Sequence, residues 1–593
     1  MNLDLSIAQS VENTLNNLYG ADFPIEKISI QETKKEFTGD RTVVVFPFLK
    51  ISKTSPEKTA SAIGEILVQE HKHITEFNVV KGFLNLVISD SYWIEFLNDS
   101  MGERCFALSP ENSKSEVMVE FSSPNTNKPL HLGHLRNIFL GNSVSNILKS
   151  IGHKVYNVQI INDRGIHICK SMVAWKLFAN GETPESSDQK GDKFVGKYYV
   201  KFDQEYKKQI QDLISSGISE EEAEKQAPIL LQARETLQKW ETKDPDTLAL
   251  WEMMNGWVYK GFESSYKTMG VSFDKLYYES NTYLKGKDEV DKGLETGAMF
   301  KKEDGSVWCD LTDKGLDQKL VLRADGTAVY MTQDIGTAIL RFQEFAGLDY
   351  QIYTVGNEQE YHFKVLFLIL EKLGFAQAKN NYHLSYGMVE LPEGKMKSRE
   401  GTVVDADDIM SEMIETARSI AAEQGKLDGL NEEEKTLAFD NIGIGALKYF
   451  LLKVDPRKGM MFNPAESIDF QGNTGPFIQY TYVRSKSVLN KSSNDLTNIN
   501  LDLSLAESEK NVIKRIYDFP TILEESAKLY NPGIVANYIY ELVKDYNTFY
   551  QNVNILKEKD VELVNLRLSF SKLTSQVIET GMGLLGIQMP DRM

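Results

Sequence analysis

The sequence predicts an α/β protein of several domains, in which a parallel-sheet domain follows a small α+β domain and precedes an all-α helix bundle. The sheet is predicted by a buried-strand pattern, VMVEFSS, then a helical pattern, then a second strand pattern, KVYNVQII. A strand, a helix and a strand within about 45 residues form a βαβ unit, whose strands are parallel. The length of 593 residues fits about four domains. From about residue 405 onward nearly every segment has helical periodicity.

Residues 1–105 indicate the small α+β domain. Ile7, Val11 and Leu15 recur at helical spacing, and PEKTASAIGEILVQEH is a second helical pattern with a proline near its start. FLNLVIS predicts a strand, and the longest compact apolar run, VVVFPFL at 43–49, predicts a buried strand. The polar stretch ALSPENSKSE predicts a linker to the next domain.

The α/β domain is expected over residues 106–400. Its first helix is LRNIFLGNSVSNILKSIG, and the pattern resumes with the strand YQIYTVG and the helix YHFKVLFLILEKLG. Residues 181–260 are rich in Glu, Lys and Gln, and they predict a helical insertion. A helical connector is expected over 401–470 and a helix bundle over 471–593. Apolar residues spaced three and four apart predict one face of that bundle: Leu563, Leu566, Phe570, Leu573 and Val577.

The composition excludes several classes of protein. Cys105, Cys169 and Cys309 lie far apart, which excludes a disulfide framework and a thiolate zinc site and fits a reducing cytosol. No stretch approaches the roughly 20 apolar residues that span a bilayer, and the N-terminal segment lacks the features of a signal peptide. The formal charge of −19 argues against indiscriminate nucleic-acid binding. Because charges are screened beyond about 8 Å, local basic patches could still hold RNA.

Two glycine-rich patterns are excluded as nucleotide sites. GMGLLG at 581–586 follows a helix rather than a strand and lies too close to the C-terminus for a βαβ unit, so it indicates a helix end. GDKFVGKY at 191–198 nearly matches a P-loop, but Tyr198 replaces the hydroxyl residue that would hold magnesium, and no strand precedes it.

The strongest functional signal is EFSSPNTNKPLHLGHLR at 120–136. A strand is expected to end there and a helix to begin near Gly133, which places His131 and His134 near a helix N-terminus. Free backbone N–H groups and the macrodipole favour phosphate at such a place. Two imidazoles can donate further hydrogen bonds to the phosphates of ATP, and the glycine permits a nucleotide to approach closely. The spacing HxxH is also compatible with half a metal site or with two histidines that only cap the helix.

A second signal is GKMKSREGTVVDADD, a loop with Lys and Gly ahead of a helix start, which by itself is compatible with a basic surface turn. Together, HLGH and KMKSR resemble the HIGH and KMSKS signatures of class I aminoacyl-tRNA synthetases, in which the second signature is a mobile loop that clamps the triphosphate. Longer segments resemble the arginyl-tRNA synthetase family: TGDRTVVVFPF, KGFLNLVIS, EFSSPNTNKPLHLGHLRN, RADGTAVYMTQDIGTA, TVGNEQEYHF and LLGIQMPDRM. The resemblance runs from about residue 35 to the C-terminus, except over 181–260.

The resemblance implies a class I Rossmann-like catalytic domain, a tRNA-contacting N-terminal domain and a C-terminal anticodon-binding bundle. It implies an arginine--tRNA ligase that activates L-arginine with ATP to arginyl-adenylate and pyrophosphate, and then transfers arginine to the 3′ end of tRNA(Arg). ATP is expected to bind with Mg²⁺, without a tightly bound metal, and the enzyme is expected to be a cytoplasmic monomer with no membrane partner. Because the arginine carboxylate is ionised at pH 7, the first step needs no general base, and catalysis is mainly positioning and charge neutralisation.

The resemblance also assigns expected roles to residues. The catalytic residues expected are His131, His134, Lys128, Lys395, Lys397 and Arg399. The residues expected at ATP are His131, Gly133, His134, Met396 and Ser398. At arginine, Glu120, Tyr330 and Asp334 are expected to frame the guanidinium, and Ser123, Asn125 and Gln359 to hold the α-amino and carboxylate end. The residues expected at tRNA are Tyr546, Tyr550 and Met593.

Simpler interpretations exist for some of these residues. A guanidinium needs carboxylates in fork geometry, and Tyr330 and Asp334 stand four apart, hence on one helical face. Such a pair is also compatible with a solvated helix surface. Tyr546 and Tyr550 could stack on unpaired bases, but buried tyrosines are common in helix bundles.

The second signature departs from KMSKS at one position, because Ser398 stands where the second lysine is expected. Lys128, three residues before His131, is a candidate for the missing cation, and Arg399 is the alternative. Among rival families, a cysteinyl enzyme would need zinc thiolates, which this chain lacks. A simple nucleotidylyltransferase would need neither the helix bundle nor Asp334. An inactive RNA-binding scaffold is disfavoured by the presence of His131, His134 and Asp334.

Overall fold

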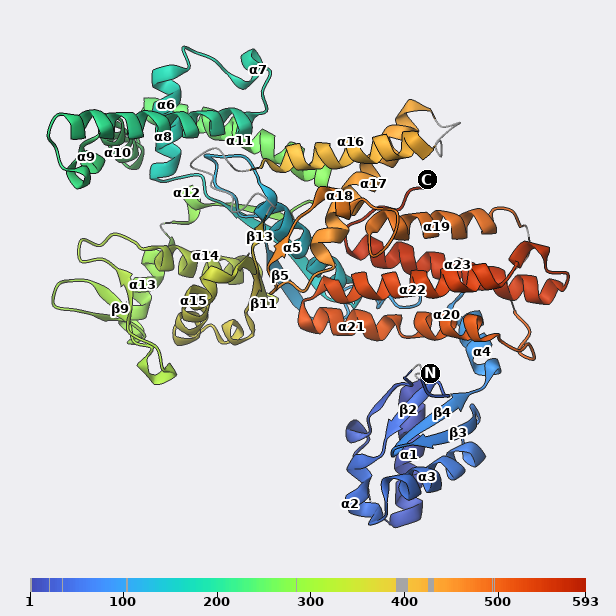
Figure 1. The fold of residues 1–593 in the computed structure, drawn as a ribbon. Coiled ribbons are helices and arrows are strands. Elements are labelled where there is room, and N and C mark those ends of the chain that lie inside the picture. The colour runs from blue at the N-terminus through green and yellow to red at the C-terminus, as the bar shows by residue number, and fades with distance from the viewer. Residues whose placement is uncertain are drawn as a thin grey trace. The chain divides into compact units, whose positions relative to one another are not determined.

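The computed structural model describes residues 3–20, 22–34, 36–102, 105–283, 285–390, 404–424, 431–492, 494, 496 and 498–593 (Figure 1). The chain packs into two compact units. The first unit comprises Met1–Ala107, Arg484–Pro520 and Glu541–Ile578, and the second comprises Leu108–Val483, Thr521–Tyr540 and Glu579–Met593. Within the described ranges, every helix is too short or too polar to cross a membrane.

The first unit contains an antiparallel sheet of order β1-β2-β4-β3. Gly64 allows the third helix, α3, to lie close to this sheet, because a Cβ atom there would stand 2.5 Å from the Phe77 ring. The elements of this unit are α1 (Leu3–Tyr19), β1 (Ile30–Glu32), β2 (Arg41–Val44), α2 (Leu49–Ser52), α3 (Pro56–Glu70), β3 (Ile74–Val80), β4 (Phe83–Ile88), α4 (Asp90–Ser100) and α20 (Glu507–Tyr517).

The apolar run at 43–49 differs from its prediction as one buried strand. Strand β2 ends at Val44, and Phe46–Phe48 form a 3-10 turn that leads into α2. Pro47 explains the difference, because proline has no backbone N–H to donate to a sheet and its φ is fixed near the helical value. Phe46 is 43% exposed, whereas Phe48 is fully buried.

A buried guanidinium joins distant segments of the first unit. Arg41 is 1% exposed, and its Nε and Nη2 donate to Asp4 at 3.0 Å and to Asp518 at 2.6 Å. Its Cζ atom lies 5.4 Å from the Tyr517 ring centroid and 6.0 Å from that of Trp93. Burial raises the pKa of the Asp518 carboxyl to about 6 even beside this arginine. The ion pair therefore connects α1, β2 and the end of α20.

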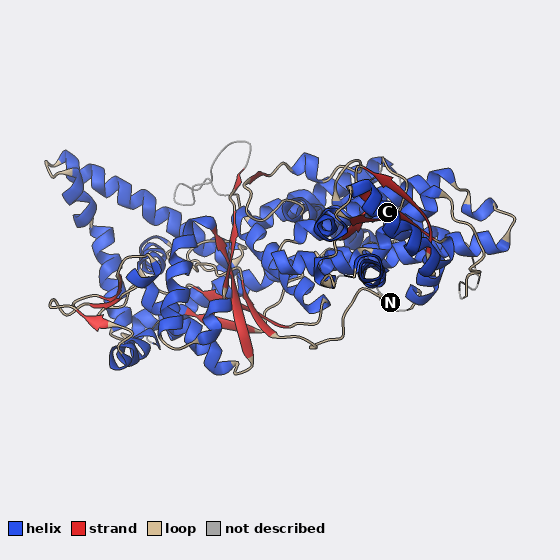
Figure 2. Cartoon of the chain, turned by 90° about the horizontal axis from the view of Figure 1, so that it is seen from below, coloured by secondary structure: helices blue, strands red, loops and turns tan. Residues whose placement is uncertain are grey.

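The second unit is built on a sheet of order β12-β11-β5-β6-β7, in which every pairing is parallel. Its strands are β5 (Glu116–Glu120), β6 (Lys154–Ile161), β7 (Lys275–Tyr278), β11 (Leu348–Gly356) and β12 (Tyr382–Tyr386). The βαβ unit predicted from the sequence is present, with α5 (Leu132–Ser150) between β5 and β6. Helices flank the long sheet on both sides in Figure 2. On one side, Phe342 of α14 (Tyr330–Glu344) packs with Met118, Val158 and Tyr277 of the sheet.

Residues 181–260, predicted as a helical insertion, are helical and lie between β6 and β7. The helices there are α7 (Pro184–Ser187), α8 (Gly191–Ser215), α9 (Glu220–Gln226), α10 (Pro228–Glu241) and α11 (Pro245–Met269), after α6 (Ile166–Phe178). The rejected P-loop segment at 191–198 is the first part of α8, which agrees with its exclusion as a nucleotide site.

The remaining elements complete the chain. Between β7 and β11 lie α12 (Glu279–Thr282), α13 (Lys285–Thr296), β8 (Phe300–Lys301), β9 (Val307–Cys309), β10 (Lys319–Leu322) and α14. Later come α15 (Glu360–Lys372), β13 (Val389–Glu390), α16 (Ala406–Gln424), α17 (Glu432–Leu452), β14 (Met460–Met461), α18 (Pro464–Ser467), α19 (Gly475–Leu489), α21 (Phe519–Leu529), α22 (Pro532–Asn552) and α23 (Val561–Leu584). The predicted bundle face lies on α23, and four of its five residues are fully buried: Leu566, Phe570, Leu573 and Val577. The GMGLLG segment ends α23, as expected, with Gly586 at a φ of 72°.

Arg136 of α5 holds two later segments of the second unit. It is 1% exposed and donates only to backbone carbonyls in the described residues. The acceptors are Gly387 (2.9 Å), Met388 (3.5 Å), Asp455 (3.3 Å), Pro456 (3.2 Å) and Lys458 (2.8 Å). Burial lowers the pKa of Arg136 to about 10, although Tyr386 and the carboxylate of Asp455 oppose the shift. The helix that follows HLGH is thereby fixed to β13 and to the loop before β14.

We expect Arg41→Met to destabilise the first unit by about 3–5 kcal/mol, because it leaves the Asp518 carboxyl buried without its partner. Urea unfolding followed by circular dichroism measures the change. The exposed Lys50→Met change is the matched control and should shift the free energy of unfolding by less than about 0.5 kcal/mol. Adding Asp518→Leu to Arg41→Met should recover much of the loss. An Arg41→Met protein as stable as the control would contradict a stabilising role for the ion pair.

Candidate functional site

The candidate site lies at the carboxyl edge of the parallel sheet. Strands β5, β6, β7 and β11 are neighbours and run in the same direction. Their carboxyl ends are therefore at one edge, where open α/β sheets bind ligands. Glu120 ends β5 and Glu279 follows β7 directly. Gln359 lies in a 3-10 turn just after β11 and is exposed.

The two histidines of HLGH begin α5, as predicted. His131 is the N-cap residue, and its backbone N–H donates to Nδ1 of His134 at 3.1 Å, which leaves Nε2 of His134 to carry the ring proton. The ring centroids are 3.9 Å apart. Burial lowers the pKa of His131 to about 4 and that of His134 well below its ordinary value. Both rings are therefore neutral at pH 7, so they can donate hydrogen bonds but supply no positive charge.

Lys128 supplies positive charge beside these rings. Its ammonium is the next cause, after burial, that lowers the pKa of His131, and it also lowers that of His134. Gly133 lies against the first ring, because a Cβ atom there would stand 3.1 Å from Cε1 of His131. The predicted ATP-site residues Lys395, Met396, Lys397, Ser398 and Arg399 lie outside the described residues.

The chain just after the second signature is paired with the first. His131 and Asp405 form an antiparallel bridge, and the N–H of Ala406 donates to the carbonyl of Leu130 at 2.9 Å. A pocket of about 400 Å³ opens beside this bridge. Its charged lining residues are Lys128, Lys193, Lys197, Asp405 and Asp408, and His131 also borders it. The pocket therefore combines hydrogen-bond donors and cations next to HLGH.

The turn after β5 is strained. Ser122 and Ser123 have φ values of 73° and 44°, in the left-handed region that favours glycine. Two contacts hold the turn: Asn137 of α5 accepts the N–H of Ser122 at 2.5 Å, and the hydroxyls of Ser122 and Tyr266 lie 2.7 Å apart. Asn125, further along the turn, is exposed and pairs with Asn162 after β6. Such strain is typical of a site that must present side chains in one fixed orientation.

Glu120 is held by a buried arginine of the protein itself. Nη1 of Arg341, on α14, lies 2.5 Å from Oε2 of Glu120, and Arg341 is 1% exposed. Its guanidinium lies between the rings of Tyr277 and Tyr353, at 4.9 and 5.7 Å. The hydroxyl of Ser123 donates to Oε1 of Glu120 at 3.3 Å. The sequence analysis predicted that Glu120 frames the guanidinium and that Ser123 holds the α-amino and carboxylate end. In the structure these two side chains are hydrogen-bonded to each other.

Tyr330 and Asp334 lie in the first turns of α14, on one face as predicted. Tyr330 is 81% exposed, and the side chain of Asp334 is 42% exposed. Oδ2 of Asp334 lies 2.6 Å from Nε2 of His362 on α15. Asp334 therefore has an ordered hydrogen-bond partner and still faces solvent, which is the situation expected of a ligand-binding carboxylate.

Glu279 is a site residue that the sequence analysis missed. Burial raises its pKa to about 7, and the nearby charges of Asp163 and Asp334 add to that shift while Arg164 opposes it. Its Oε1 lies 4.0 Å from Nη1 of Arg164. The signal for Glu279 is the short strand KLYY directly before it, which repeats the arrangement of β5 and Glu120. The carboxylate of Asp334 is near enough to contribute to the raised pKa of Glu279.

The residues expected at tRNA behave differently from one another. Tyr546 is fully buried and its hydroxyl lies 3.0 Å from that of Ser571, so its ring is not exposed to a base in this structure. Tyr550 is partly exposed, lines a pocket of about 220 Å³, and has the Arg484 guanidinium 5.3 Å from its ring. Met593 is partly exposed at the C-terminus.

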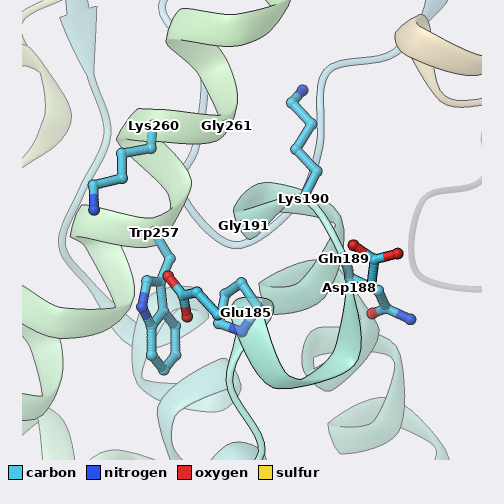
Figure 3. Close-up of a pocket in the computed structure, with 9 residues that line it drawn as sticks. Glu185, Asp188, Gln189, Lys190, Gly191, Trp257, Lys260 and Gly261 are labelled. Carbon is cyan, nitrogen blue, oxygen red and sulfur yellow. The ribbon is translucent and has the colours of Figure 1, made fainter.

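A further pocket of about 390 Å³ lies within the insertion, between α7, the start of α8 and α11 (Figure 3). It contains none of the predicted site residues. Trp257 and Glu185 both line it, and the Lys190 side chain points away from them in this view. The Lys190 ammonium lies 2.5 Å from Oδ2 of Asp407 and 3.2 Å from Oδ2 of Asp192. Lys190 therefore fastens the insertion to α16.

Comparisons with known proteins agree with the geometry. Residues 104–463 match the catalytic domain of tRNA synthetases class I (R), residues 478–593 match the DALR anticodon binding domain, and residues 5–88 match the arginyl tRNA synthetase N terminal domain. A Bacteroides fragilis protein named "Arginine--tRNA ligase" is 55% identical over 600 residues and covers 100% of both chains. A Flavobacterium psychrophilum protein of the same name is 54% identical over 604 residues, again covering 100% of both.

Solved structures share the fold over the full chain. The Thermus thermophilus arginyl-tRNA synthetase superposes with a TM-score of 0.78 at 22% identity and covers 100% of both chains. The Plasmodium falciparum arginyl-tRNA synthetase superposes with a TM-score of 0.76 at 19% identity, covering 100% of this chain and 99% of that one. The fold, the matches to the family's domains and full-length identity above one half lead to one conclusion: the chain belongs to the class I arginyl-tRNA synthetase family.

Proposed function

We propose that this chain activates arginine with ATP and then transfers it to tRNA, at the carboxyl edge of the β5–β6–β7–β11 sheet. The observation that carries the proposal is the convergence there of a phosphate-binding helix start and carboxylate side chains. His131 and His134 provide the first, and Glu279 and Asp334 provide the second. The first suits a triphosphate and the second suits a guanidinium.

In the first step, an oxygen of the arginine carboxylate attacks the α-phosphorus of ATP. The bond from that phosphorus to the bridging oxygen breaks, and pyrophosphate leaves with the electron pair. The neutral rings of His131 and His134 donate hydrogen bonds to phosphate oxygens, and Lys128 contributes the positive charge that the rings lack. The pocket of about 400 Å³ beside them is the proposed place of the phosphates. Mg²⁺ enters with ATP as part of that substrate.

Different residues hold the two ends of the arginine substrate. Asp334 and Glu279 hold the guanidinium, since a bidentate cation is best recognised by carboxylates. Glu120 and Ser123, held by Arg341 and by the strained turn, receive the positively charged α-amino group. Tyr330 is proposed to frame the guanidinium, and Asn125 and Gln359 to hold the α-amino and carboxylate end; all three are exposed.

In the second step, a hydroxyl of the terminal ribose of tRNA attacks the carbonyl carbon of the adenylate, the bond from that carbon to the phosphate oxygen breaks, AMP leaves with the electron pair, and the hydroxyl proton is released to solvent. Tyr550, with Arg484 over its ring, is proposed to receive an unpaired anticodon base in the adjoining pocket, because stacking is the usual basis of such contacts. Met593 is proposed to contact the same RNA. The chain is proposed to act as a cytoplasmic monomer.

Pyrophosphate exchange with each of the twenty amino acids, with and without total tRNA, tests the proposed function. Exchange is expected with arginine and not with the others. Exchange driven by another amino acid, or by none under either condition, would contradict the proposal.

We expect Asp334→Asn to raise the KM for arginine roughly tenfold to a hundredfold while the KM for ATP stays nearly constant. The change removes a charge-assisted hydrogen bond to the guanidinium, worth about 1.5–3 kcal/mol. Exchange kinetics at varied arginine and varied ATP separate the two effects. Asp317→Asn, on an exposed loop, is the control for loss of one negative charge. An equal rise for both substrates would remove Asp334 from the guanidinium pocket.

The arginine KM should depend on pH through Glu279. Its pKa of about 7 means that the carboxyl is mostly protonated at pH 6 and mostly ionised at pH 8. Because only the ionised form attracts a guanidinium, the KM for arginine should fall as pH rises, by about tenfold between pH 6 and pH 8. Glu279→Gln should remove this dependence and leave a uniformly high KM. A wild-type KM for arginine that is flat across this range would contradict the assignment.

We expect Lys128→Ala to lower the rate of activation about a hundredfold to a thousandfold with little change in arginine KM, because one preorganised donor to the phosphates is lost. Lys149→Ala, at the exposed end of α5, is the matched control. Adding Ser398→Lys to Lys128→Ala should restore part of the rate by supplying the cation from the second signature. A nearly silent Lys128→Ala together with a severely impaired Arg399→Ala would instead identify Arg399 as the phosphate cation.

A further inference from the structure

One connection between the insertion and the candidate site is the buried residue Asp163. This residue lies in the turn after β6 and is 1% exposed. Three side chains of α11 donate to it. Nε1 of Trp251 and Nδ2 of Asn255 reach its carbonyl at 2.6 and 3.2 Å, and the hydroxyl of Tyr259 reaches its Oδ2 at 3.0 Å. The insertion is therefore fixed to the turn after β6 by hydrogen bonds of defined geometry.

The same carboxylate holds the short helix that carries Glu279. The backbone N–H of Ser280 donates to Oδ1 of Asp163 at 2.8 Å, and the Ser280 hydroxyl donates to Oδ2 at 2.7 Å. Ser280 belongs to α12, which has only four residues. A helix of one turn has no stability of its own, because nucleation is unfavourable. The orientation of Glu279 therefore depends on this anchor.

Arg164 forms a second connection between the insertion and Glu279. Its side chain is 11% exposed, with Nη2 at 3.4 Å from Glu241 and Nη1 at 4.0 Å from Glu279. The guanidinium lies 3.9 Å from the ring of Tyr283 and 5.3 Å from that of Trp240. Glu241 and Trp240 end α10, so the insertion supplies one face and one counter-ion of this arginine. A guanidinium packed against aromatic rings keeps a fixed position.

We propose that α10 and α11 of the insertion position the guanidinium-binding carboxylate of Glu279, acting through Asp163 and Arg164. The inference rests on the proposed function of Glu279 and gives a role to a segment in which the sequence alone shows none. Fork recognition of a guanidinium requires a carboxylate held in one orientation, and displacements of about 1 Å already weaken such sites. Tyr259, Trp251 and Arg164 are thus positioning residues for arginine, without contacting it.

The groups that face Glu279 come from several elements. Arg164 and Asp163 belong to the turn after β6, and Asp334 belongs to α14. Tyr259→Phe removes one hydrogen bond to the anchor and no charged residue, although the pKa of the Asp163 carboxyl also rises when this donor is lost. The phenylalanine ring keeps the packing against Tyr278, whose ring lies 5.3 Å away.

The test uses the full chain with tRNA present throughout. We expect Tyr259→Phe and Trp251→Phe each to raise the arginine KM about threefold to tenfold, with ATP KM and melting temperature at the values of the control. The control is Tyr198→Phe, which removes a hydrogen bond of the same kind, to Glu182 at 2.7 Å, elsewhere in the insertion. Unchanged arginine KM, or equal rises for arginine and ATP with a lower melting temperature, would overturn the inference.

A double-mutant cycle with Glu279→Gln distinguishes the inference from the function on which it rests. We expect Tyr259→Phe to have no further effect on arginine KM once Glu279 is changed. If Glu279→Gln alone leaves arginine KM unchanged, the proposed role of Glu279 fails. If Glu279→Gln raises the KM but Tyr259→Phe acts equally in both backgrounds, the proposed role stands and the positioning route is wrong.

Discussion

The second unit brings several carboxylates together at the candidate site, and the ion pairs and hydrogen bonds that accompany them organise that site. Burial nevertheless raises the pKa of one of them, Glu279, to about 7. Partly buried carboxyl groups left alone take up protons. Here each one has a resident partner: Arg341 lies 2.5 Å from Glu120, Arg164 lies 4.0 Å from Glu279, and His362 lies 2.6 Å from Asp334. These carboxylates come from β5, α12 and α14, which are far apart in the sequence. The fold of the second unit therefore decides which carboxylates the site contains.

The two histidines at the start of α5 are neutral, and this limits what they can contribute to binding phosphate. Burial that lowers the pKa of His131 and His134 makes them dependable hydrogen-bond donors and removes them as sources of charge. Any positive charge that the protein itself supplies there has to come from lysine or arginine. Lys128 lies next to the rings, and Ser398 stands where the second signature is expected to have a lysine. Both observations fit a cation supplied by the loop before HLGH instead of by the second signature.

What the sequence could predict was local. The βαβ unit and the helix start at His131 follow from periodicity and turn residues within short windows, and they are confirmed. The strand expected through Pro47 was wrong because one residue ended it. Glu279 was missed because KLYY is too short to show a pattern. Arg341 and Arg164 resemble ordinary surface arginines in sequence, and their roles depend on partners from distant elements. Tyr546 looked like a base-stacking residue until packing showed it fully buried.

The guanidinium of Arg136 has a consequence for how the chain reaches its native state on the ribosome. Its partners follow it by as many as 322 residues, at the carbonyl of Lys458. At synthesis rates of about 5–20 residues per second, the helix after HLGH waits roughly 15–65 seconds for them. Until then, the five N–H groups of the Arg136 guanidinium, which are buried in the folded chain, remain hydrated. The sheet and its first helix can associate early, but the core around Arg136 closes only after the far segment has emerged.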